Sequence, residues 1–168
     1  MPADIYKPEL WNSFFTMVGG GVAALTGLVF VALSLNVTEM TSDATHKYRS
    51  INTLAGLTAV FVRCGLVLMG GQSHRAVGID LFVVASFGAI SFLYGFRQAF
   101  KFEAHPSKQR LVTGTLLYAV ELAGALVLIL GSVVGLYMAA AAILLNVAFM
   151  ISAAWLLVNG VYSARVTK

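Results

Sequence analysis

The chain has 168 residues, of which 59% are hydrophobic and only 11% are charged, and its mean hydropathy is +0.86. A water-soluble domain needs roughly a quarter of its residues charged, so this composition excludes a soluble globular protein and indicates that most of the chain lies in lipid. Because a bilayer core takes about 20 residues per helix, the length allows about four to six spans and leaves no room for a separate catalytic domain.

The chain contains five apolar runs that are each long enough to cross a bilayer. We therefore predict an all-α integral membrane helical bundle, with a single transmembrane domain over residues 14–160 between an N-terminal tail (1–13) and a C-terminal tail (161–168). The spans are predicted at about 14–35, 51–71, 79–100, 111–131 and 136–157.

The last two runs follow one another without a charge or a proline. As one helix, the roughly fifty residues from 111 to 160 would measure about 75 Å, more than twice the hydrocarbon thickness. We therefore expect the chain to turn back near Gly131 and Gly135.

The N-terminal segment lacks the basic region of a cleavable signal peptide, because Asp4, Lys7 and Glu9 nearly cancel, so we expect it to be retained. Aromatic side chains with a polar edge are enriched at membrane interfaces. Trp11 is accordingly predicted to anchor the outer interface and Trp155 the inner one.

Basic residues are distributed unequally over the two sides of a five-span topology. One side carries Lys7 and Arg75, and the other carries eight basic residues: Lys47, Arg49, Arg97, Lys101, Lys108, Arg110, Arg165 and Lys168. The positive-inside rule then predicts an N-terminus outside and a C-terminus in the cytoplasm. The basic face is expected to meet anionic lipid headgroups, and without a folded basic module the sequence gives no support for nucleic-acid binding.

Two ionisable residues lie near the middle of predicted spans, where an unpaired charge costs several kcal/mol. Arg63 comes 12 residues into the second run and Glu121 comes 10 into the fourth, while Asn146 comes 10 into the fifth. The depths of Arg63 and Glu121 differ by about 3 Å, so the three side chains are predicted to form one buried polar layer.

Three interpretations of this layer remain open. It can be a structural ion pair that fixes helix register, with Asn146 as an additional hydrogen-bond partner. It can be a proton or ion pathway that uses Glu121, with the charge of Arg63 adjusting the properties of that carboxylate. It can also face another subunit or a lipid headgroup.

Small residues accompany the polar ones at helical spacing, which favours close helix packing in lipid. The first span has a strip that we expect to face the interior of the bundle, formed by Thr16, Gly20, Ala23, Gly27 and Ser34. Asp80 is predicted to open the third span near the outer interface, either as a residue stabilised by the helix macrodipole or as part of an outer vestibule that gathers cations.

Catalytic and cofactor signatures are missing from the sequence. The single cysteine, Cys64, excludes an intrachain disulfide and any CxxC pair, and the three histidines all fall in predicted loops, which disfavours an intramembrane haem. The sequence contains no HExxH or GxSxG motif. We predict no enzyme activity, no cofactor and no metal site.

The stretch 23–36, which reads AALTGLVFVALSLN, follows Trp11 and Phe14, and Gly71-Gln72 precedes Gly78-Ile79-Asp80-Leu81. These segments resemble the first span and the second-to-third connection of a group of small, uncharacterised bacterial inner-membrane proteins. The resemblance covers about the first half of the chain and implies a bacterial, multi-span, non-enzymatic membrane protein. It carries over no mechanism, and Arg63 and Glu121 are outside it.

The sequence thus predicts a homo-oligomeric channel- or transporter-like protein of the inner membrane. Its polar layer would pass an ion, a proton or a small solute. A homo-oligomer is expected because the helices have more small-residue faces than the helix contacts within one thin bundle use. The alternative is a non-catalytic accessory or scaffold subunit of a larger membrane complex.

Overall fold

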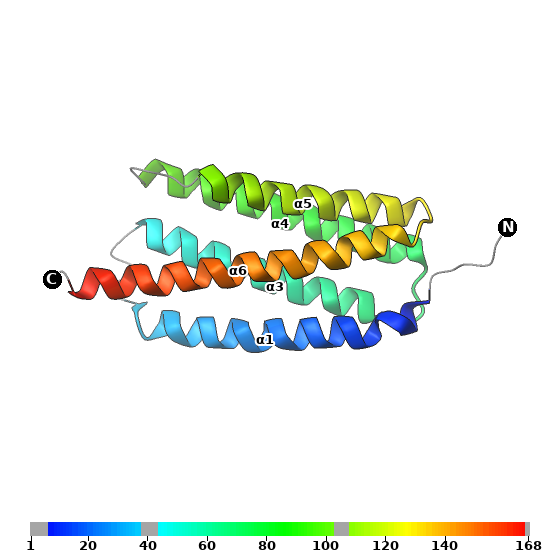
Figure 1. The fold of residues 1–168 in the computed structure, drawn as a ribbon, viewed down its shortest axis with the longest axis horizontal. Coiled ribbons are helices and arrows are strands. Elements are labelled where there is room, and N and C mark those ends of the chain that lie inside the picture. Colours follow the sequence, from blue (N-terminus) through cyan, green and yellow to red (C-terminus); the bar gives the residue numbers. More distant parts are fainter. Residues whose placement is uncertain (1–6, 38–43, 103–107, 167–168) are drawn as a thin grey trace.

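The protein is all-helical in its described residues, 7–37, 44–102 and 108–166 of a computed structural model (Figure 1). A short 3-10 helix, η1 (Pro8–Trp11), leads into α1 (Asn12–Ser34). The remaining helices are α3 (Ala44–Leu68), α4 (His74–Phe102), α5 (Lys108–Ile129) and α6 (Val134–Val166). All five α-helices are long and apolar enough to cross a membrane, which confirms the predicted fold class.

Four of the helices form a closed ring. Helix α3 packs on α4, α4 on α5, α5 on α6, and α6 packs back on α3, so that α3 and α5 face each other across the centre. Helix α1 lies outside this ring, where it packs mainly on α3 and also touches α6 (Figure 1). The described N- and C-terminal ends lie at opposite ends of the bundle, as an odd number of crossings requires.

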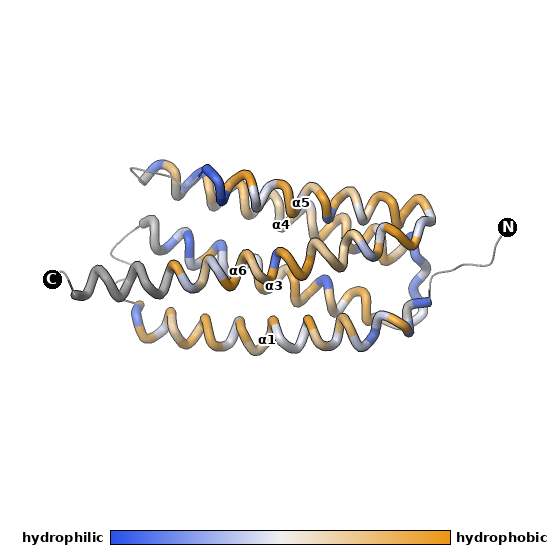
Figure 2. The backbone as a smooth tube through the Cα atoms, in the orientation of Figure 1, coloured by the Kyte–Doolittle hydropathy of each residue, from blue (hydrophilic) through white to orange (hydrophobic). Residues whose placement is uncertain are grey.

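The helices extend beyond the predicted spans. Helix α3 begins seven residues before the predicted start at 51, α4 begins at His74 rather than 79, and α6 continues to Val166, through most of the predicted tail 161–168. Hydropathy marks only the part of a helix that prefers lipid. The helical backbone hydrogen bonds continue into the polar residues on either side, so each helix is longer than its apolar run. Figure 2 shows the apolar stretches along the helices and polar segments near several of their ends.

The turn between α5 and α6 lies where the two glycines are. Gly131 adopts a φ of 93°, a conformation that residues with a Cβ rarely take. Gly135 brings α6 against α5, because a Cβ there would overlap backbone atoms of Gly124 and Leu128. The Gly131 and Gly135 pair therefore serves a turn and a contact within one chain.

The small-residue strip of the first span does not face the interior, so that prediction was wrong. The residues of α1 that are buried are Phe15, Val18, Gly19, Val22 and Val29. The strip is exposed at all five positions, which are Thr16, Gly20, Ala23, Gly27 and Ser34. Because α1 packs mainly on one helix, only a narrow face is covered, and large apolar side chains such as Leu28 and Phe30 are exposed beside the strip.

Candidate functional site

The three predicted polar residues meet in the centre of the helix ring. Arg63 comes from α3, Glu121 from α5 and Asn146 from α6, and all three side chains are at most 1% exposed. Tyr118, one turn before Glu121 on α5, is buried beside them and lies next to both Arg63 and Asn146. The fourth helix of the ring, α4, contributes Gly88.

Arg63 and Glu121 form an ion pair across the diagonal of the ring. Nη1 of Arg63 donates a hydrogen bond of 2.7 Å to Oε2 of Glu121 and lies 2.6 Å from Oε1. Both side chains have no exposed surface. In so apolar a setting each charge needs the other, because transferring either one alone into hydrocarbon costs several kcal/mol.

The guanidinium of Arg63 fits against α4 because residue 88 has no side chain. A Cβ on Gly88 would lie 2.9 Å from Nη2 of Arg63 and 3.0 Å from a ring carbon of Tyr118. The ring of Tyr118 has its centroid 5.6 Å from Cζ of Arg63, within the range of a cation–π contact. Sequence reasoning missed Gly88, since nothing in its span distinguishes it from a packing glycine.

Several polar atoms of the layer have no hydrogen-bond partner in the described protein. They are Nε and Nη2 of Arg63 and Nδ2 of Asn146, whereas Oε1 of Glu121 is held by the ion pair with Nη1 of Arg63. A buried polar atom without a partner costs about 1–3 kcal/mol. The layer thus offers several N–H donors to water or to a small polar solute.

Asp80 lies near the start of α4, at the end of the ring opposite to the basic residues Lys101 of α4 and Lys108 of α5. It is the seventh residue of α4, which begins at His74, so the expectation that Asp80 opens the helix was wrong. The carboxylate accepts a hydrogen bond of 2.8 Å from Nε2 of Gln72. The contact ties the second turn of α4 to the residues that precede the helix.

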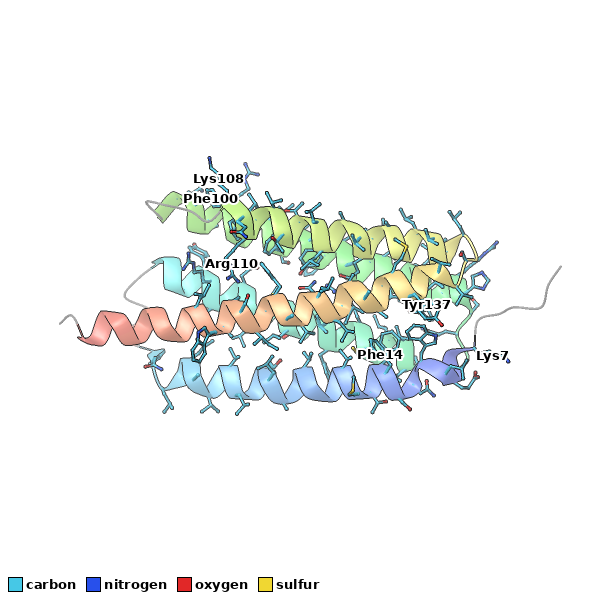
Figure 3. All side chains as sticks on the ribbon, viewed as in Figure 1. Lys7, Phe14, Phe100, Lys108, Arg110 and Tyr137 are labelled. Carbon is cyan, nitrogen blue, oxygen red and sulfur yellow. The ribbon has the colours of Figure 1, made fainter. Side chains whose placement is uncertain are left out.

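The two predicted interface anchors lie in different surroundings. Trp11 packs in an aromatic cluster with Phe14, Phe15 and Tyr137, with a ring-centroid distance of 4.7 Å to Tyr137. Figure 3 shows Phe14 and Tyr137 at the same end of the bundle as Lys7. Trp155 lies near the other end on α6 and is 65% exposed.

The single cysteine lies beside the polar layer. Cys64 is a free, buried thiol next to Arg63, and its Cβ lies where α3 meets Gly19 of α1. Among the described residues there is no group of three or more His, Cys, Asp and Glu side chains that could hold a metal ion.

Comparison with known proteins adds no assignment, since no protein-family model, curated protein or solved structure matches the chain.

The ion pair predicts a non-additive response to mutation. Arg63→Leu should lower the free energy of unfolding by about 3–5 kcal/mol, because it leaves Glu121 charged and unpaired in hydrocarbon. The double variant Arg63→Leu with Glu121→Leu should recover most of that lost stability. Thermal unfolding of the purified proteins in mild detergent measures both changes. A double variant as unstable as the single one would contradict the pairing.

Proposed function

We propose that this small integral membrane protein is channel- or transporter-like and passes an ion, a proton or a small solute along the layer formed by Arg63, Glu121 and Asn146. The observation that carries the proposal is the set of polar atoms in this layer that lack a protein partner. Polar residues at membrane depth are costly, and they commonly mark solute and proton pathways.

The arrangement of the layer supports passage through one bundle rather than between bundles. All of its side chains point into the ring of α3, α4, α5 and α6, and none is lipid-facing. The unpartnered N–H groups of Arg63 and Asn146 suit a water molecule or a small hydrogen-bond acceptor. Glu121 can in addition accept and release a proton, whereas Arg63 stays charged.

Glu121→Gln tests the proposal because it keeps the shape and much of the hydrogen bonding of residue 121 but removes its charge. In liposomes, we expect proton or ion flux to fall about tenfold or more, which corresponds to a barrier higher by about 1.4 kcal/mol. Glu9→Gln is a matched control, since Glu9 is exposed at the N-terminal end, and it should leave flux unchanged. Wild-type liposomes with no flux above protein-free liposomes, under proton, potassium and chloride gradients, would contradict the proposal.

A non-catalytic accessory or scaffold subunit is the second candidate. It is favoured by the completeness of the burial, since Arg63 and Glu121 are both 0% exposed and packed by Gly88 and Tyr118. In this case the ion pair fixes the register of the four helices and conducts nothing. The outward face of α1 would then contact a helix of another protein.

The exposed face of α1 supports assembly into a homo-oligomer. At Gly20, Gly21 and Gly27 an added Cβ would meet nothing within 4 Å, so these positions face away from the rest of the bundle. In lipid, helix association depends on close contact, and small residues permit it. We therefore propose that α1 of one copy packs on another copy along this face.

Gly27→Leu should reduce the oligomer to smaller species, because a bulky side chain separates the two helix backbones. Gly65→Leu is the control, since Gly65 is also exposed and open but lies on α3. Native mass spectrometry in mild detergent measures the subunit number. We expect at least about one half of the Gly27→Leu protein to be monomeric, and no such change for Gly65→Leu. A monomeric wild type would refute the assembly.

We also propose that the protein lies in a bacterial inner membrane, with its N-terminus outside and its C-terminus in the cytoplasm. The starts of α3 and α5 and the end of α4 carry six basic residues at one end of the bundle, whereas Lys7 and Arg75 lie at the other. Short segments rich in Lys and Arg remain on the cytoplasmic side. The basic end would there face the anionic lipid headgroups of the inner leaflet.

Cysteine labelling checks this orientation in a Cys64→Ala background. A membrane-impermeant thiol reagent added outside intact inner membranes should label Ser73→Cys, which lies before α4, and should not label Lys108→Cys, which begins α5. The contrast should be at least about tenfold, because the hydrocarbon core excludes a charged reagent. The reverse pattern would overturn the orientation.

A further inference from the structure

The guanidinium of Arg63 pairs with Glu121 through only one of its nitrogen atoms. Nη1 lies 2.7 Å from Oε2 and 2.6 Å from Oε1 of Glu121. Nε and Nη2 are buried and have no hydrogen-bond partner in the described part of the chain. In a planar guanidinium, the N–H groups of Nε and Nη2 lie along one edge and point in the same direction. The ion pair therefore leaves one complete edge of Arg63, with two parallel donors, unused.

Once the ion pair is counted, the polar atoms of the layer that lack a partner are all hydrogen-bond donors. Besides the two on Arg63, Nδ2 of Asn146 is buried and has no partner among the described residues. Both carboxylate oxygens of Glu121 are held by Nη1 of Arg63. A cation would meet N–H groups here, whereas an anion accepts hydrogen bonds from them, and the edge of a guanidinium binds two oxygens of one oxyanion. The layer thus favours an anion over a cation.

Charge neutrality makes the binding of an anion depend on a proton. Arg63 and Glu121 together carry no net charge, so an added anion would leave one uncompensated negative charge in hydrocarbon, which is unfavourable. A proton taken up by Glu121 removes this excess charge. Arg63 then becomes the counter-ion of the bound anion, and the layer as a whole stays neutral.

Glu121 is the group beside the bound anion that can take up this proton. Helices α4 and α6 bring Gly88 and Asn146 to the layer, which do not titrate, and α1 contains no titratable side chain. Two further titratable side chains, Tyr118 and Cys64, lie beside the guanidinium. Both are already protonated and uncharged at neutral pH, so neither can take up a further proton.

We infer that the layer binds one small monovalent anion together with one proton, with the anion on the Nε–Nη2 edge of Arg63 and the proton on Glu121. The binding stands on the geometry of the layer alone. Its consequence for transport rests on the proposed function: an anion and a proton that cross together move no net charge.

Thermal unfolding in mild detergent tests the anion site without requiring flux. Sodium nitrate supplies a planar monovalent oxyanion and should raise the melting temperature of the wild type. Sodium sulfate at equal ionic strength should not, because one proton leaves a bound sulfate with an uncompensated charge. The nitrate concentration for half of the rise should be about tenfold lower at about pH 5 than at about pH 8, since the site takes up a proton. An unchanged melting temperature in nitrate, or an equal response at both pH values, would overturn the inference.

Arg63→Lys keeps the positive charge that pairs with Glu121 but lacks the two parallel donors. It should raise the nitrate concentration needed for half of the stabilisation by about tenfold, the effect of losing one charged hydrogen bond. Arg97→Lys is the matched control, because Arg97 is exposed near the end of α4, and it should respond to nitrate like the wild type. A full response in Arg63→Lys, or an equal loss in Arg97→Lys, would refute the site.

Glu121→Gln tests the position of the proton, and it decides the question even where Arg63→Lys does not fold. Glutamine carries no negative charge to neutralise, so nitrate should stabilise this variant equally at both pH values. Glu9→Gln, at the exposed N-terminal end, should keep the pH dependence of the wild type. A nitrate response of Glu121→Gln that still strengthens at the lower pH would contradict the assignment of the proton to Glu121.

Liposomes that contain a pH-sensitive dye separate the anion site from the proposed passage. An inward nitrate gradient should acidify the lumen of wild-type liposomes, and a membrane potential set with a potassium ionophore should not change the rate. Nitrate binding without acidification would support the site and contradict the proposed function. Flux of another ion through a protein that does not bind nitrate would refute the site and leave the proposed function in place.

Discussion

An ion pair in hydrocarbon has to be enclosed by protein on every side, and the Arg63–Glu121 pair imposes this condition on four helices at once. Helices α3 and α5 supply the charges across the diagonal, α6 supplies Asn146, and α4 supplies the space left by Gly88. If any of the four moved away, a buried charge or a polar side chain would be exposed to lipid. The pair therefore fixes the closure of the ring as well as the register of its helices, whether or not the layer also conducts.

Much of this arrangement could be predicted from the sequence, because lipid leaves few options. Five long, continuous apolar runs indicate helices, since backbone groups in hydrocarbon must be hydrogen-bonded and the strands of a barrel would alternate apolar and polar residues. Residue counting placed Arg63, Glu121 and Asn146 at one depth, and an ionisable residue at that depth needs a partner. The turn at Gly131 followed from the length of the last two runs. These predictions rest on depth along the membrane normal, which the rise per residue determines.

Rotation around the bundle could not be predicted in the same way. In a water-soluble protein, the apolar face of a helix is the face that packs on the core. Every face of these helices is apolar, so the hydropathy pattern does not show which face contacts another helix and which contacts lipid. The strip on α1 was therefore assigned to the wrong side, and Gly88 could not be separated from other glycines. Arg110 contributed only to the predicted topology, because its contacts with Phe149 and Ser152 depend on how α5 and α6 are rotated.

The separation of 58 positions between Arg63 and Glu121 also sets an order of events during synthesis. At about 5–20 residues per second, Glu121 is made roughly 3–12 s after Arg63, and α6 follows later still. During that interval the helix that carries Arg63 has no counter-charge to receive it in the hydrocarbon. Insertion of α3 alone is less favourable by about 2.5–3.5 kcal/mol, so we expect the nascent α3 to stay near the insertion machinery or the headgroups until α5 emerges. Helices α3 to α6 are thus expected to enter the bilayer as one cooperative unit, while α1, which supplies none of the polar layer, can enter first and alone.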